Sequence, residues 1–247
     1  MQAESFSVEV GGLEVGVQSE GPALRRLLAS STRLTLRDGY VEPGMLLGRP
    51  GSDKPTASPL WVAYESGDIV MRRTKTEADV ALAATLQLLA IEHALTSGLL
   101  AMRFRTVVLE SGELILVHPS ALSSMAGYDR RLEARGGLVL CPTIVAIDPP
   151  TGEVHFVSQD LDARQPVGCR EVKAVLLGDG DDPERVDSYR MIGLARSAVR
   201  YPSSNLDQIL SQIEELEQSW REKIELLQPD GFSSRLDQLV LAPRDDG

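Results

Sequence analysis

The residues whose types and spacing could do chemistry lie in the segment 113–125, which has the layout of a strand, a tight loop and a helix start. A loop that binds nucleotide phosphates needs glycines for close backbone approach, a lysine for the phosphate charge and a hydroxyl for magnesium. Set against the pattern G-x-x-x-x-G-K-[S/T], the segment has other residues at these positions, in order His118, Ser123, Ser124 and Met125. The sequence therefore predicts a phosphate loop that lacks the groups needed for phosphoryl transfer.

His118 suggests a second chemistry, because a histidine beside Ser120 or Ser123 could activate a serine hydroxyl as a nucleophile. Such a site also needs a carboxylate that orients the histidine and donors that form an oxyanion hole. The chain has no G-x-S-x-G elbow, in which a hydrolase serine is commonly presented. We therefore rank a hydrolase below an inactive phosphate loop.

Composition limits the classes of partner and compartment. The 247 residues are 43% hydrophobic and only 4% aromatic, which predicts a compact aliphatic core. A net charge of −11 repels nucleic-acid phosphates, so we expect no nucleic-acid partner. Two cysteines without a C-x-x-C pair predict a reduced, cytoplasmic setting, and with only three histidines we predict no metal site. No apolar run reaches the ~18 residues of a membrane span, so none is predicted.

The elements that would position these residues follow from local patterns. Alternation and glycine turns predict hairpins in the N-terminal third, whereas near-continuous apolar runs in the middle third predict strands buried on both faces. We expect strands at 5–10, 13–18, 33–36, 60–64, 68–71, 106–109, 114–117, 138–140, 144–147, 154–157, 172–177 and 235–241. We expect a loop at 42–59 and helices at 22–28, 76–98, 122–134 and from 205 onward. In the helix at 76–98, Thr76 is expected to cap the start and Gly98 to end it. A β-rich N-terminal subdomain at 1–75 and an α/β core at 76–247 are predicted.

The C-terminal helix has an apolar stripe with a spacing near 3.5 residues. The stripe continues to Leu227, before Pro229 ends the helix, and Glu217 is among the acidic residues on the opposite, solvent side. Our candidates for contact with a protein partner through a coiled coil are the stripe residues Ile213, Leu216 and Trp220. The alternative, which we prefer, is that the stripe packs on the domain's own sheet, since the run spans barely three heptads.

The order of elements and several strings resemble the HPr kinase/phosphorylase-like proteins, which have a phosphoenolpyruvate-carboxykinase-type P-loop fold. The strings are 107–117 for the first two strands, 135–137 for a glycine turn, and V-A-I-D-P-P-T-G at 145–152. The resemblance implies an α/β protein with a mixed, twisted sheet of P-loop kinase type, a small N-terminal β-rich layer and a long C-terminal helix.

The chain departs from this family where the chemistry would be. The family has an aspartate pair that holds magnesium, and this chain has Pro142 and Thr143 at those positions. Loss of one preorganised donor typically costs ~10²–10³ in rate, so several losses together predict an inactive protein. We therefore expect a pseudo-enzyme without cofactor that acts as a scaffold or regulatory subunit and binds a protein, either itself or an active paralogue. One alternative is a divergent ATP-dependent kinase or phosphorylase of a peptide or small molecule, with a site that uses His118, Ser120, Ser124 or Asp148. The other is a domain that senses an anion.

Overall fold

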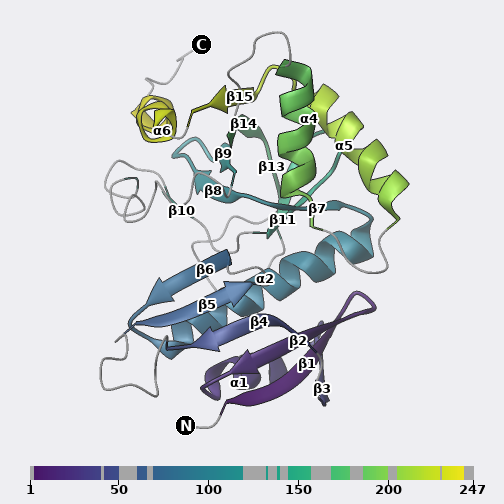
Figure 1. Ribbon diagram of the computed structural model, residues 1–247, viewed down its shortest axis with the longest axis vertical. Coiled ribbons are helices and arrows are strands. Elements are labelled where there is room, and N and C mark those ends of the chain that lie inside the picture. The colour runs from purple at the N-terminus through teal and green to yellow at the C-terminus, as the bar shows by residue number, and fades with distance from the viewer. Residues whose placement is uncertain are drawn as a thin grey trace. The chain divides into compact units, whose positions relative to one another are not determined.

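The computed structural model divides the chain into two compact units, with the boundary between Gly98 and Leu99 (Figure 1). The sequence predicts a boundary after residue 75, whereas the structure groups the long helix at 77–97 with the first unit, because this helix packs on the N-terminal sheet. The residues that the structure describes are 3–39, 42–49, 60–65, 69–118, 132, 138–139, 144–156, 168–178, 186–199, 205–228 and 230–241.

The first unit contains a six-stranded sheet with the strand order β3-β1-β2-β4-β5-β6. Its strands are β1 (Glu4–Val10), β2 (Leu13–Ser19), β3 (Thr35–Asp38), β4 (Pro43–Gly48), β5 (Trp61–Glu65) and β6 (Ile69–Thr74). The antiparallel pairs β1–β2 and β5–β6 confirm both predicted hairpins. The prediction of a loop at 42–59 is wrong for residues 43–48, because they form β4, which pairs with β2 and β5. Pro43 is the first residue of β4, a position at which a proline is tolerated in a sheet.

Two helices complete the first unit, α1 (Ala23–Ala29) and α2 (Glu77–Ser97). The Thr76 hydroxyl accepts a hydrogen bond from the Asp79 backbone, and Gly98 ends α2 with a left-handed φ of 69°, as predicted. Among the described helices, only α2 is long and apolar enough to meet the criteria for a membrane span. Most of its apolar residues are buried inside the unit, as in the core helix of a globular fold.

The second unit contains a five-stranded sheet, β10-β8-β9-β14-β15, and a four-stranded sheet, β13-β12-β11-β7. The strands of the first are β8 (Arg105–Val108), β9 (Leu114–Val117), β10 (Leu138–Val139), β14 (Val172–Gly178) and β15 (Ile224–Leu227). Those of the second are β7 (Leu100–Arg103), β11 (Ile144–Ile147), β12 (Val154–Phe156) and β13 (Gly168–Arg170). Parallel pairs join β9, β14 and β15, whereas the other pairs of both sheets are antiparallel.

Helices cover both faces of the five-stranded sheet (Figure 1). The helices are α4 (Val186–Ser197), α5 (Leu206–Trp220) and α6 (Gly231–Leu241). Along β9, Leu114 and Leu116 pack with residues of α4 and α5, whereas Ile115 and Val117 pack with residues of α6. The strand is therefore buried on both faces, as its apolar run predicted, and the chain is an α/β protein with mixed sheets.

Two predictions near the C-terminus need correction. The expected strand 235–241 is helical, since it forms most of α6. Helix α5 ends at Trp220, and the residues after it form β15 beside β14, so the helix does not continue to Leu227. Helix α4 and strand β7 were not predicted, and the expected helix 122–134 lies outside the described residues except for Leu132.

Candidate functional site

The predicted phosphate loop leaves the carboxyl end of β9. That strand pairs in parallel with β14, and the His118 N–H donates to the Leu176 carbonyl at 2.9 Å, so the half-buried His118 still lies against the sheet. The carboxyl ends of parallel strands are where open α/β sheets bind ligands. The strand and loop start are therefore in the expected order, while the remaining predicted positions lie outside the described residues: Ser120, Ser123, Ser124, Met125, Pro142 and Thr143.

Asp148, one of the residues that a divergent kinase could use, closes a turn at the end of β11. Its carboxylate accepts a hydrogen bond from the Thr151 hydroxyl at 2.7 Å, and its carbonyl accepts from the Gly152 N–H at 2.8 Å. Strand β11 belongs to the four-stranded sheet, whereas His118 follows a strand of the five-stranded sheet. The polar atoms of Asp148 therefore have a local structural role.

Helix α5 anchors this turn, which we call the 148–152 turn. The buried Trp220 indole N–H donates to the Gly152 carbonyl at 2.9 Å, and the Ser219 hydroxyl lies 2.8 Å from the Pro150 carbonyl. Gly152 has φ +69°, and a Cβ there would lie 2.4 Å from the indole nitrogen. Glycine is therefore required both for the backbone conformation and for close contact with α5.

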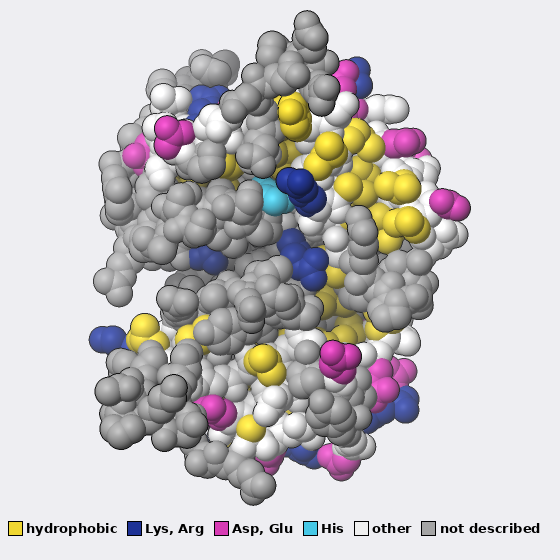
Figure 2. Space-filling view, in the orientation of Figure 1, with side chains coloured by type: hydrophobic (Ala, Val, Ile, Leu, Met, Phe, Trp, Pro, Cys, Tyr) yellow, Lys and Arg dark blue, Asp and Glu magenta, His cyan; other side chains and the backbone are white. Residues whose placement is uncertain are grey.

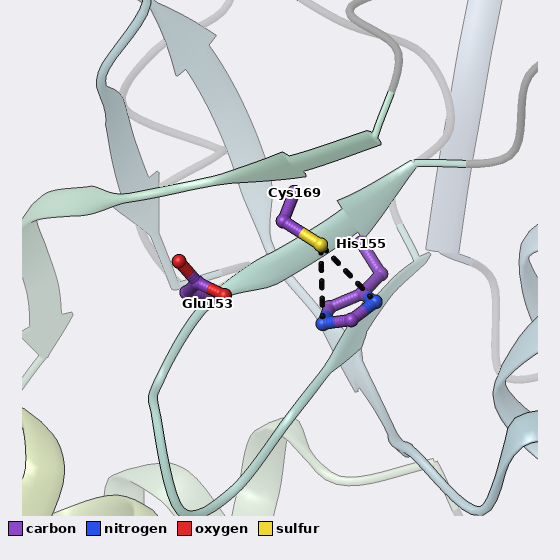
Figure 3. A group of neighbouring side chains, drawn as sticks. All are labelled: Glu153, His155 and Cys169. Atoms are coloured by element: carbon purple, nitrogen blue, oxygen red, sulfur yellow. Dashed lines mark hydrogen bonds between the residues drawn. The ribbon is translucent and has the colours of Figure 1, made fainter.

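Immediately beyond the turn, the side chains of Glu153, His155 and Cys169 converge (Figure 3). His155 and Cys169 are directly opposite in the antiparallel register of β12 and β13, and Glu153 is two residues before His155, on the same face of the strand. The Cys169 sulfur lies 3.5 Å from His155 Nδ1 and 3.6 Å from Nε2. One candidate ligand atom from each residue lies within 4.8 Å of the other two. We call these three residues the Glu–His–Cys cluster.

Sequence reasoning missed the Glu–His–Cys cluster. Glu153 and His155 alternate with the buried Val154, which could have placed both on the outer face of a predicted strand. Nothing local connects them to Cys169, which belongs to another strand and joins them only through the pairing of β12 with β13. The prediction of no metal site relied on the small number of histidines and the lack of a C-x-x-C pair. A group of ligands brought together by strand register needs only one histidine and one cysteine and no such pair.

The predicted partner-binding residues of the C-terminal helix are buried inside their own unit. Ile213 is 1% exposed and Leu216 and Trp220 are 0% exposed, in a core shared with β9 and α4. These side chains are not available to a partner in this structure, and the stripe instead packs on the domain's own sheet, the alternative we preferred. Burial follows from the amphipathic pattern, because the same apolar stripe that could form a coiled coil also fits a sheet.

Beside its buried stripe, α5 carries exposed leucines. Leu206 is 51% exposed and Leu210 is 40% exposed, one helical turn apart, and Ile192 of the neighbouring α4 is 45% exposed. We call these three residues the α4–α5 patch, and Figure 2 shows hydrophobic side chains gathered over these helices. The sequence placed Glu217 on the solvent side, yet it is buried between α4 and α5.

Glu217 is held by charges from both helices. Its carboxylate accepts two hydrogen bonds from the Arg221 guanidinium, at 3.1 and 3.3 Å, and lies 3.9 Å from Arg190. The hydrogen bond to Glu217 raises the pKa of Arg221 above its ordinary value. The buried carboxylate is therefore charge-paired, and its ion pair with Arg190 joins α5 to α4.

Comparison with protein families, with curated proteins and with solved structures finds no match to this chain. The resemblance to HPr kinase/phosphorylase-like proteins therefore stays a prediction that depends on the sequence strings and on the order of the elements.

Proposed function

We propose that this chain is a catalytically inactive, kinase-like protein that binds another protein as a scaffold or regulatory subunit. The observation that carries the proposal is the α4–α5 patch. Single exposed apolar residues are ordinary, but the hydrophobic side chains gathered over α4 and α5 in Figure 2 favour a protein contact.

The replacement of the phosphate-loop residues supports the part of the proposal that says the protein is catalytically inactive. A β9-to-loop junction at the carboxyl end of a parallel strand is a suitable place for phosphates, but the loop begins with His118 where the motif has glycine. The motif lysine and hydroxyl are replaced by Ser124 and Met125. Phosphoryl transfer consists largely of positioning and charge neutralisation, so this chain lacks what the reaction needs most.

The charges around the patch indicate the chemistry of the partner surface. Asp207 is next to Leu206, and Glu214 follows Leu210 by one helical turn; both acidic residues are exposed. The whole chain carries a net charge of −11. We expect a partner with an apolar centre and a basic rim, since complementary charge speeds encounter and rejects wrong partners.

The patch is tested by substitution with a matched control. Aspartate at both Leu206 and Leu210 should weaken partner binding more than 100-fold, because each leucine loses about 1.5–3 kcal/mol of burial and gains a charge that must be desolvated. Leu46→Asp is the control: Leu46 is 42% exposed and lies on β4 in the other unit. The partner is first identified with the native chain and then purified. It should bind the Leu46→Asp control with the same affinity as the native chain. Equal binding to both variants would remove the α4–α5 patch from the proposal.

The inactive state is tested by calorimetric titration of the purified chain with ATP or ADP in the presence of magnesium. The proposal predicts no saturable heat. Micromolar binding that depends on magnesium would contradict it and favour the divergent kinase, whose activity should then be lost on Ser124→Ala.

A further inference from the structure

The Glu–His–Cys cluster combines a carboxylate, an imidazole and a thiol within 4.8 Å. Sulfur and imidazole ligands are typical of zinc and its transition-metal neighbours, whereas calcium and magnesium prefer oxygen alone. A lone exposed cysteine has no such meaning, but a cysteine facing a histidine across a strand pair offers two ligands of the right kind.

The sulfur-to-nitrogen spacing in the cluster fits tetrahedral zinc. Bonds of about 2.3 Å to sulfur and about 2.05 Å to nitrogen place those two ligand atoms about 3.6 Å apart at the tetrahedral angle. The Cys169 sulfur lies 3.5 and 3.6 Å from the two ring nitrogens of His155. Because the sulfur is equally far from both nitrogens, the ring must rotate about its Cβ–Cγ bond to aim one lone pair at the metal. The half-exposed position of His155 permits this rotation.

The backbone beneath the cluster is fixed by the fold. Pairing of β12 with β13 sets His155 opposite Cys169. The Glu153 N–H donates to the Thr151 hydroxyl at 3.2 Å, and its carbonyl accepts from the Asp148 N–H at 3.0 Å. Since α5 also anchors the turn, the backbone of these residues is held in place, and the side chains would rotate to reach a coordination geometry.

We propose that Glu153, His155 and Cys169 bind one zinc ion or a chemically similar divalent transition-metal ion. Three protein ligands leave a fourth tetrahedral position for water or another small ligand, the arrangement of an open zinc site. The cluster belongs to the second unit and is separate in sequence from both the phosphate loop and the α4–α5 patch. A test of the metal site is therefore independent of the proposed scaffold function.

The test uses the full chain without an affinity tag, reduced with a phosphine so that no added thiol competes for metal. Cobalt(II) replaces zinc as a spectroscopic probe, because a cobalt–thiolate bond gives a charge-transfer band and tetrahedral cobalt gives intense visible bands. We expect one cobalt per chain and loss of both signals when zinc is added. No thiolate band, or one metal shared by two chains, would overturn the proposal.

Matched variants assign the ligands. Cys169→Ser should abolish the charge-transfer band, whereas Cys141→Ser, which removes the chain's other thiol, should leave it intact. His155→Gln and Glu153→Gln should each weaken zinc binding at least 100-fold, since even changes to residues behind metal ligands cost 10–100-fold. Their controls are His93→Gln and Glu171→Gln, both expected to bind normally. A band that survives Cys169→Ser, or equal zinc affinity in all variants, would show an adventitious site and refute the assignment.

Discussion

Replacing Trp220 by alanine should test whether the C-terminal stripe is a core or a docking surface. The Trp220 side chain is 0% exposed, contacts Phe104 edge-on at 6.2 Å between ring centroids, and donates to the Gly152 carbonyl. If the stripe is core, the substitution removes a large buried side chain and a hydrogen bond. If it were a docking surface, stability would change little.

The expected magnitude follows from these contacts. Truncating a buried aromatic residue to alanine costs about 3–5 kcal/mol in the free energy of unfolding. Trp220→Phe keeps most of the volume but leaves the buried Gly152 carbonyl without its donor, which costs about 1–3 kcal/mol. Leu210→Ala, at a 40% exposed position on the same helix, should change stability by no more than about 0.5 kcal/mol.

Urea unfolding followed by circular dichroism measures these differences. Trp61, the chain's other tryptophan, lies in the first unit, so its fluorescence reports that unit separately in the Trp220 variants. A loss below about 1 kcal/mol for Trp220→Ala would refute the burial of the stripe. Equal losses for alanine and phenylalanine would refute the volume argument and leave the hydrogen bond as the main contribution.

Three further substitutions probe the turn, the helix start and the second face of the sheet. Gly152→Ala should lower the free energy of unfolding by at least about 1–3 kcal/mol in urea, because φ is +69° and the new Cβ meets Trp220; an unchanged midpoint would contradict this. Asn205→Ala should cost about 1 kcal/mol by thermal unfolding, since the Asn205 side chain caps α5, and aspartate at the same position should restore the stability. Phe232→Ala should cost about 3–5 kcal/mol in urea if α6 covers the sheet, whereas Ser234→Ala, at an exposed site, should be neutral. Similar changes in unfolding free energy for Phe232→Ala and Ser234→Ala would contradict the packing of α6 on the sheet.

Elements marked by local chemistry were predictable. Thr76 with its capping bond and Gly98 with its left-handed φ mark the ends of α2, and the apolar run 114–117 marks a strand buried on both faces. Each of these signals depends on residues only a few positions apart, so it can be read from the sequence alone. The replacement of the phosphate-loop residues is equally readable, because it concerns residue identity alone.

Elements that depend on distant partners were not predictable. The apolar stripe of α5 continues to Leu227, yet the chain leaves the helix after Trp220 because residues 224–227 pair with β14. The segment 235–241 was mistaken for a strand, because its helical period becomes clear only with Phe232, which packs with Leu236 against the sheet. In both places tertiary contacts outweighed a short and ambiguous local pattern.

By itself, the sequence determined the α/β character, the strand runs, the main helix caps and the absence of the motif residues from the phosphate loop. Only the tertiary structure decided that Trp220 faces the core and that His155 meets Cys169 across a strand pair. Capping, turn chemistry and alternation act between neighbours in the chain, whereas the buried face of a helix and the register of two strands depend on residues far apart in sequence.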